Sequence, residues 1–452
     1  MELYVHIPFC VRKCGYCDFV SAPAGRAVQE SYMKALRKEI CLAAEERRAD
    51  GCGKRRRGAD MRAERRGSSR QSGREGCMDD VVTSVFFGGG TPSIVEAGEL
   101  AKTLACIRRE FVVAQDAEIT LEANPGTLAK EKLEIYRKAG VNRLSIGLQS
   151  AEDKELSLLG RIHTFEEFKE SYRLAGEAGF RNISVDLMAA LPGQSVKSFE
   201  RSLRAVTGLF PAPEHISVYN LIVEEGTPFY EKYHRQVLAR EAGEEDCRPL
   251  PTEEEERDMY ALTGNLLAAC GYERYEISNY AKPGFACRHN VGYWTGAPYL
   301  GFGISASSYL SGSYARNGSR ADERFTDGRR FSNTDDLGTY LRILEEWESG
   351  RETALGRKLL GRLRQGEETV TRERAMEEFM FLGLRMTKGV SGDEFAGRFG
   401  TDLEDVYGTA LGALERDGLM ERTMPGEGMD VRWRLTARGI DVSNCVLAEF
   451  LF

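Results

Sequence analysis

Three cysteines near one end of the chain have the residue type and spacing of metal ligands. Cys10, Cys14 and Cys17 are separated by three and then two residues on one short segment. Three thiolates on a tight loop can bind three irons of a 4Fe-4S cube and leave the fourth iron open to an exogenous ligand. Two other interpretations stay open on spacing alone. A zinc site would need a fourth cysteine or histidine, and a thioredoxin-like redox pair would need only Cys14 and Cys17.

The other cysteines are scattered along the chain. Apart from Cys287, they show no ligand-like spacing, so we expect plain thiols at Cys41, Cys52, Cys77, Cys106, Cys247, Cys270 and Cys445.

A glycine run and several isolated polar residues each follow a β-rich segment. The run covers residues 88–90 and is followed by Thr91, and glycine lets backbone lie close to a ligand. Glu122, Gln149, Asp186 and Asn220 end later segments. Because βα barrels bind ligands at the carboxyl ends of their strands, we expect these residues and the cysteines to form one rim.

Short β-rich segments alternate with helical patterns over the first half of the chain. The alternation predicts an α/β fold with a parallel sheet, and six strands with five crossovers predict a partial, open (β/α)6 barrel. The expected strands are residues 3–7, 81–87, 117–122, 143–148, 182–187 and 215–221, and the expected helices are residues 29–46, 96–111, 128–139, 164–178 and 195–209. Gly140 and Gly179 stand where a helix C-terminus favours glycine.

The pattern divides the chain into three parts. Residues 1–235 are expected to form the barrel core, residues 236–355 an extension of it, and residues 356–452 a small helical or winged-helix-like domain. Within the extension, the acidic stretch 239–257 is expected to be an irregular surface connection.

The last part is mainly helical in pattern. Met376, Phe379, Met380 and Leu384 share one helix face, and Ser391 with Glu394 predicts a capping box that opens the next helix. Residues 431–436 are expected to form a strand.

Composition favours a soluble globular chain. The sequence has 452 residues, of which 42% are hydrophobic and 29% charged, with a net charge of -8. It contains no unbroken apolar run long enough to span a membrane and begins without a signal-peptide pattern, so a cytoplasmic location is expected.

One segment is strongly basic. Residues 47–74 hold eleven Lys or Arg and three acids, and we expect residues 47–78 to be a disordered insertion in the first crossover. Such a segment can contact nucleic acid or an anionic membrane, but a charge run is usually just solvated, so no specific nucleic acid is expected.

The cysteine spacing and the glycine run together resemble the radical S-adenosylmethionine (SAM) superfamily. Further stretches are similar to its oxygen-independent coproporphyrinogen III oxidase group: Tyr-Val-His-Ile-Pro-Phe-Cys at 4–10, Gly-Gly-Gly-Thr-Pro-Ser at 88–93, Glu-Ala-Asn-Pro at 122–125, Arg-Leu-Ser-Ile-Gly-Leu-Gln at 143–149 and Asp-Leu-Met-Ala-Ala-Leu-Pro-Gly-Gln at 186–194. The resemblance implies a 4Fe-4S cluster on Cys10, Cys14 and Cys17, with SAM on the fourth iron.

The same resemblance implies which residues contact SAM. Tyr4, Tyr16 and Glu122 would line the bound molecule, and Gly89, Gly90 and Thr91 would form a glycine platform. Further SAM or substrate contacts would come from Gln149, Arg161 and Asp186. The alternative for Arg161 is an ordinary residue on a surface helix.

Two features depart from the oxidase and resemble the HemW branch, which consists of haem chaperones: the oxidase has a fourth cysteine where this chain has Phe19, and it has a longer segment before its cluster loop. A third feature agrees, because residues 289–294 match the HNxxYW signature of that branch. The resemblance implies haem binding by His289, with Tyr293 and Trp294 offering flat apolar surface to the porphyrin. A hydrogen-bonded structural role for His289 and a thiolate ligand at Cys287 are the alternatives.

These observations favour a haem chaperone that binds a 4Fe-4S cluster, SAM and haem and transfers haem to acceptor haem proteins, with respiratory, membrane-associated proteins as candidate acceptors. The alternative is an oxygen-independent coproporphyrinogen III oxidase. The sequence leaves open whether SAM is cleaved, which would require an electron donor, and whether the chain forms a homodimer.

Overall fold

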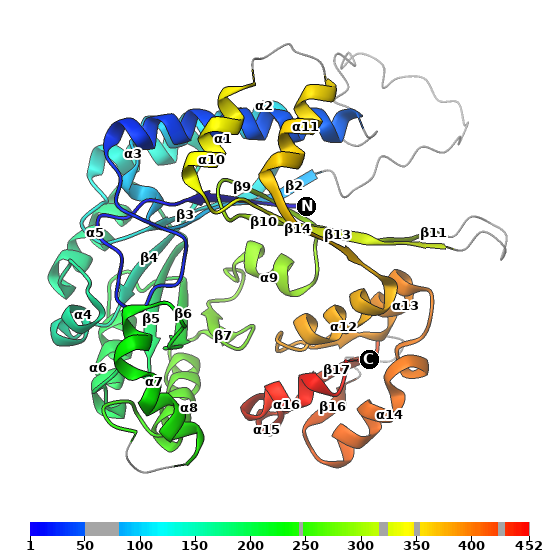
Figure 1. The fold of residues 1–452 in the computed structure, drawn as a ribbon. Helices are drawn as coiled ribbons and strands as arrows, with labels where there is room; N and C mark the ends of the chain where they lie inside the picture. The colour runs from blue at the N-terminus through cyan, green and yellow to red at the C-terminus, as the bar shows by residue number, and fades with distance from the viewer. Residues whose placement is uncertain (50–80, 244–246, 316–323, 348–352, 424–429, 452) are drawn as a thin grey trace, which may run out of the picture.

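A curved sheet of six parallel strands forms the centre of the molecule (Figure 1). The computed structural model describes residues 1–49, 81–243, 247–315, 324–347, 353–423 and 430–451. The six strands lie side by side in chain order, which confirms the predicted open barrel. They are β1 (Glu2–Ile7), β2 (Val81–Gly89), β3 (Val112–Ala123), β4 (Arg143–Gln149), β5 (Ile183–Ala189) and β6 (His215–Asn220).

Later strands extend both edges of this sheet. Strand β9 (Tyr299–Phe302) pairs in parallel with β1, and β10 (Ser307–Leu310), β13 (Gly328–Asn333) and β14 (Arg364–Val370) continue that edge in antiparallel order. Strands β8 (Asn279–Ala281) and β7 (Glu273–Arg274) extend the other edge beyond β6. A separate ribbon consists of β11 (Ser313–Ala315) and β12 (Arg324–Thr326).

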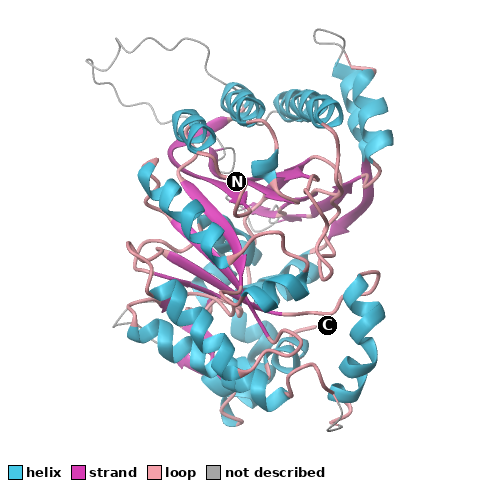
Figure 2. Ribbon diagram, turned by 90° about the vertical axis from the view of Figure 1, so that its left-hand side faces the viewer, coloured by secondary structure: helices cyan, strands magenta, loops and turns pink. Residues whose placement is uncertain are grey.

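Helices cover the outer face of the sheet (Figures 1 and 2). They are α1 (Arg26–Ala49), α2 (Ala97–Glu110), α3 (Lys130–Ala139), α4 (Asp153–Leu159), α5 (Phe165–Glu177) and α6 (Val196–Thr207), joined near β14 by α10 (Leu337–Glu345) and α11 (Thr353–Leu363). Thr164 and Ser195 close capping boxes at the starts of α5 and α6, and Gly140 ends α3 in the left-handed conformation. Among the described helices, none has the length and hydropathy needed to cross a bilayer.

Side chains of the parallel strands alternate largely between apolar and polar. In β1, Leu3, Val5 and Ile7 belong to the hydrophobic core shared with the outer helices. The residues between them face the inside of the barrel, because successive side chains of a strand point to opposite faces. The inward set is mainly polar: Glu2, Tyr4, His6, Ser84, Phe86, Glu118, Thr120, Glu122, Arg143, Ser145, Ser184, Asp186, His215, Ser217 and Tyr219.

Two expectations about irregular segments need correction. Residues 47–49 are the last turn of α1, where Arg48 forms an ion pair with Glu110 of α2 at 3.2 Å, and the rest of the predicted insertion lies outside the described residues. The stretch 239–257 is irregular only in part. Helix α7 (Pro228–Glu241) covers its start, and α8 (Glu253–Ala269) begins within it because Thr252 and Glu255 form a capping box.

A second hydrophobic core defines the C-terminal domain. It is built on α12 (Arg372–Gly383), α13 (Gly392–Phe399), α14 (Leu403–Arg416), α15 (Ala437–Asp441) and α16 (Ser443–Ala448), with a small sheet of β15 (Val390–Ser391), β17 (Arg432–Leu435) and β16 (Met420–Thr423). The expected boundary at residue 356 falls inside α11. Leu359, Leu360 and Leu363 of that helix pack in the barrel core, so the second core begins near Val370.

Candidate cluster and ligand site

The three cysteines lie on the loop that joins β1 to α1, at the carboxyl end of the strand. Backbone bonds hold this loop: Cys10 N donates to Ala22 O at 3.2 Å, and Thr91 N donates to Phe9 O at 2.7 Å. His6 Nε2 lies 2.9 Å from the carbonyl oxygen of Val20. A carbonyl only accepts, so Nε2 carries the proton of this neutral imidazole.

The three thiols are close enough to influence one another and remain partly exposed. Burial raises the pKa of Cys17, and the nearby Cys14 and Cys10 sulfurs raise it further. In the described part of the chain, no three Cys, His, Asp or Glu side chains converge as ligands of a single metal ion. A 4Fe-4S cube, whose three cysteine ligands each bind a different iron, fits three thiols spaced along one loop in this way.

Arg161 connects the cysteine loop to two neighbouring strand ends. Its Nη2 donates to Asn124 Oδ1 at 2.7 Å and to Gly147 O at 2.6 Å, and its Nη1 lies 3.8 Å from Cys14 Sγ. Burial raises the pKa of Tyr16, and the positive charge of Arg161 offsets part of this increase. Arg161 stands beyond the end of α4 and is partly buried, so the surface-helix alternative is wrong.

The glycine run packs against the cysteine loop. A Cβ on Gly90 would lie 2.7 Å from Phe9 O and 3.0 Å from Ile7 O, so only glycine fits there. Thr91 is buried; its Oγ1 accepts from Asn124 at 2.8 Å and lies 3.5 Å from Cys10 Sγ. These contacts between protein groups place the glycine run against the cysteine loop.

Glu122 is a partly buried carboxylate that accepts a hydrogen bond from Gly89 N at 3.2 Å. Burial raises its pKa to about 8, the neighbouring Asp186 contributes to the increase, and Arg143 offsets only part of it. A carboxylate in this setting favours a further positively charged group that enters the pocket. The amino group of SAM has that charge, so the pocket fits the ligand that the cysteine spacing implies.

Asp186 lies deeper in the barrel and is already surrounded by donors. Ser145 Oγ donates to it at 3.0 Å and Ser184 Oγ at 3.2 Å, and Arg143 keeps its burial-raised pKa from rising further. Its expected contact with SAM therefore remains a prediction. Asn220, at the end of β6, is exposed.

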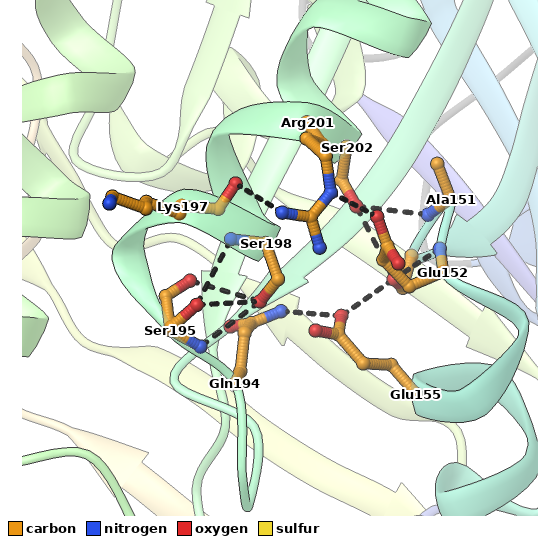
Figure 3. Close-up of polar contacts among 10 residues, drawn as sticks. Ala151, Glu152, Glu155, Gln194, Ser195, Lys197, Ser198, Arg201 and Ser202 are labelled. Atoms are coloured by element: carbon orange, nitrogen blue, oxygen red, sulfur yellow. Dashed lines mark hydrogen bonds and ion pairs between the residues drawn. The ribbon is translucent and has the colours of Figure 1, made fainter.

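A buried polar network lies just beyond Gln149, the last residue of β4 (Figure 3). Figure 3 shows Gln194 Nε2 donating to Glu155 Oε2 at 2.8 Å, and Ser150 Oγ donates to the same oxygen at 2.6 Å. Gln149 itself has a positive φ of 75°, a conformation that side-chain-bearing residues rarely adopt. Its amide lies against Gly147, where a Cβ would be 3.0 Å from Nε2. Gln149 therefore lies beside Gly147, whose carbonyl oxygen accepts from Arg161.

His289 points into the barrel from α9 (Arg288–Trp294). Its ring stacks on Phe86 at 4.9 Å between centroids, and the Tyr4 ring lies 6.3 Å away. His289 Nδ1 lies 2.8 Å from Ser84 Oγ and 3.0 Å from Glu2 Oε2. Ser84 donates its only hydrogen to Glu2, so it accepts from His289. Nδ1 therefore carries a proton, and Nε2, the other ring nitrogen, has no partner among the described residues.

The two aromatic residues of the signature, Tyr293 and Trp294, do not form one flat surface with His289. The Tyr293 and Trp294 rings are 5.4 Å apart and perpendicular at 89°, so only one of them could lie along the face of a planar ligand. Tyr293 is half exposed and lines a cleft of about 330 Å³ with Tyr299, Tyr309 and Arg330. Trp294 packs under Arg385 of the C-terminal domain. Cys287 is fully buried and donates to Glu118 at 3.3 Å, so it does not face solvent.

Comparison with known proteins identifies the family. The Radical SAM superfamily model matches residues 4–206, and the HemN C-terminal domain model matches residues 370–442. Heme chaperone HemW of Bacillus subtilis (strain 168) is 34% identical over 449 residues, which cover 99% of this chain and 98% of that protein. The chain belongs to the HemW family. Heme chaperone HemW of Escherichia coli (strain K12) is 36% identical over 309 residues, 68% of this chain and 69% of that protein.

A solved structure shares the HemW chain's fold. Coproporphyrinogen III oxidase (HemN) from Escherichia coli, described as a radical SAM enzyme, superimposes with a TM-score of 0.69 over 99% of this chain and 89% of that one. The two sequences are 22% identical, so the likeness shows a common fold and no more.

Sequence reasoning missed three residues of this HemW site: Glu2, His6 and Asn124. Asn124 and His6 stand inside two of the quoted motifs, so motif membership was an available signal for both. Glu2 gave no such signal, because its partner His289 is 287 residues away and the pair forms only when the chain folds.

Proposed function

We propose that this HemW-family protein binds a 4Fe-4S cluster and SAM at the cysteine loop, binds haem through His289, and passes haem to acceptor haem proteins. The observation that carries the proposal is the state of His289, together with the full-length family match. An imidazole whose Nδ1 proton is held by a carboxylate presents Nε2 as a ligand nitrogen, the arrangement that metal-binding histidines share.

The cluster would be held by Cys10, Cys14 and Cys17, and Arg161 would hold the loop in place through Asn124 and Gly147. When bound together, the cluster and SAM supply reductive cleavage of the sulfonium, the chemistry of the radical SAM superfamily. The chain's own part is to bind and orient. Glu122 attracts the ligand's ammonium.

Tyr4 connects the two ligand positions. Its ring lies beside His289, its hydroxyl donates to His6 Nδ1 at 3.2 Å, and Glu122 raises its pKa beyond the effect of burial. The cluster side and the His289 side therefore share one buried wall of the barrel.

An anaerobic haem titration of cluster-reconstituted protein tests the proposal, with the Soret band followed for wild type and His289→Ala. His234→Ala, a partly buried histidine on α7, is the matched control. We expect saturable one-to-one binding in wild type and control, and a weaker, spectrally shifted complex in His289→Ala. Binding that ignores both His289 and the cluster would overturn the haem site.

Absence of saturable binding would favour the alternative, coproporphyrinogen oxidation. The direct assay is then anaerobic decarboxylation of coproporphyrinogen III with SAM and a reductant. The acceptor proteins, the cytoplasmic location and homodimer formation remain predictions. Haem transfer to an apo-acceptor, cell fractionation and light scattering of the cluster-loaded protein test them in turn.

A further inference from the structure

Two cysteines outside the cluster site form a close pair on neighbouring outer helices. Cys41 on α1 and Cys106 on α2 bring their Sγ atoms to 3.7 Å. Both were expected to be plain thiols, because 65 residues separate them in the chain. A disulfide has an S–S length of about 2.05 Å, so the sulfurs need to approach by about 1.7 Å to bond.

A guanidinium stands over this pair. Arg109 Nη2 lies 3.4 Å from each sulfur, and Glu110 accepts from Arg109 Nε at 2.7 Å, which fixes the orientation of the guanidinium. The Cys41 hydrogen bond, together with Arg109, lowers the pKa of Cys106 to about 7. The pair therefore loses its first proton near neutral pH and carries a thiolate there.

The Cys41–Cys106 pair differs from the other described thiols outside the cluster loop in having both a neighbouring thiol and access to solvent. Cys41 is partly exposed and Cys106 is buried behind it. Cys270 and Cys445 are exposed, and Cys247 and Cys287 are buried; none of these four lies within hydrogen-bond distance of another sulfur in the described residues. Outside the cluster loop, Cys41 and Cys106 are thus the only described cysteines that combine an adjacent thiol, a cation and access from solvent.

We propose that Cys41 and Cys106 are a redox-active dithiol that exchanges with low-molecular-weight disulfides such as oxidised glutathione. The thiolate of the pair attacks one sulfur of the small disulfide, whose S–S bond breaks and releases one small thiol. The second cysteine then attacks the mixed disulfide, forms the Cys41–Cys106 bond and releases the second small thiol. Overall the two protein thiols are oxidised, one small disulfide is reduced to two thiols, and the two protons go to the released thiols.

The position of the bond suggests what it does. Helix α1 follows the cysteine loop and α2 follows the glycine run, so the bond covalently joins the two helices that leave the cluster site. Oxidation would restrain α1 and α2 relative to each other and thereby raise the midpoint of thermal unfolding. Neither sulfur belongs to the proposed cluster ligands, and the inference does not depend on haem binding.

The test is an anaerobic equilibration of the cluster-loaded protein in glutathione buffers of graded ratio, followed by acid quenching, alkylation and tryptic mapping without reduction. We expect a cross-linked pair of peptides, residues 39–47 with residues 103–108, that grows with oxidised glutathione as a two-electron couple and disappears on reduction. Cys270 and Cys445, the internal controls, should take up glutathione singly. Free thiols at Cys41 and Cys106 in the most oxidising buffer would overturn the proposal.

Two variants test separately the pairing of Cys41 with Cys106 and the activation of the thiolate by Arg109. Cys106→Ser removes the cross-link and leaves at most a mixed disulfide on Cys41. Arg109→Gln keeps both thiols and should slow their exchange by up to about tenfold, because the thiolate fraction falls. Exchange in Arg109→Gln at the wild-type rate would contradict activation by the guanidinium, and a cross-link in Cys106→Ser that used another cysteine would contradict the pairing.

Discussion

Glu2 Oε2 lies 3.0 Å from His289 Nδ1, although 287 residues separate Glu2 from His289 in the chain. Strand β1 carries Glu2 into the interior, and α9 brings His289 to it from the inner side of the sheet (Figure 1). Ser84 on β2 completes the contact. The carboxylate therefore decides which nitrogen of His289 is available to a ligand.

Replacing Glu2 by Gln should weaken haem binding. The amide keeps the size of the side chain but removes the negative charge that holds the Nδ1 proton, and losses of such partners typically cost about tenfold or more in metal affinity. We expect a Kd for haem raised by about tenfold in anaerobic Soret titrations. Glu30→Gln, on the exposed face of α1, should bind like wild type. Equal affinities for Glu2→Gln and wild type would show that Glu2 does not position His289.

Replacing Glu122 by Gln should change the pH dependence of stability of the protein without cofactors. The pKa of Glu122 is raised from 4.5 to about 8, so the folded state holds the proton more tightly than the unfolded chain between these values. Stability from this group is therefore lost as pH rises through that window, by at most about 1.4 kcal/mol per pH unit.

Glu122→Gln has no such proton to lose. Its thermal midpoint relative to wild type should rise between pH 5 and pH 8, as followed by circular dichroism, while SAM binding to the cluster-loaded protein should fall. Glu200→Gln, on the outer surface of α6, serves as control. A constant difference across this pH range would mean that Glu122 is not the partly buried acid described above.

Replacing Arg161 by Lys should destabilise the bound cluster. Lysine keeps the charge but cannot reach Asn124, Gly147 and Cys14 together, as the planar guanidinium does. We expect faster loss of the absorbance near 410 nm when an iron chelator is added, by several-fold. Arg12→Lys is matched to it, because Arg12 makes one exposed bond to Gly160 O. Equal rates in the two variants would exclude a specific role of Arg161.

Replacing Glu39 by Leu should destabilise the whole fold. The buried Glu39 carboxylate accepts from Tyr340 at 2.5 Å, Asn333 at 2.6 Å and Gly303 N at 2.8 Å, which ties α1 to the extension strands. Leucine leaves Tyr340 Oη and Gly303 N without this acceptor, each at a cost of about 1–3 kcal/mol, whereas Asn333 Nδ2 keeps its bond to Gly303 O at 2.8 Å. The urea midpoint should fall accordingly. Glu30→Leu, whose partner Arg26 is exposed, should leave it nearly unchanged.

Local signals in the sequence account for the elements and the cluster loop. The period of two in β1 to β6, the capping boxes at Thr164 and Ser195 and the spacing of the cysteines each act over a few residues, so they can be read from the chain. The same rule would have found α8, since Thr252 and Glu255 form the box that begins it. The prediction of an irregular stretch failed because acidic composition was given more weight than this local signal.

The tertiary structure alone decided which polar side chains meet. The sequence shows that Glu2, Ser84, Glu122 and Asp186 alternate with apolar neighbours, but it does not show that their face is the inside of a barrel. Their contacts join segments that only strand order and sheet closure bring together, and free energies of such long-range contacts leave no local trace in the chain. For the same reason the Arg161 contacts, the proton position on His289 and the Cys41–Cys106 pair became apparent only in three dimensions.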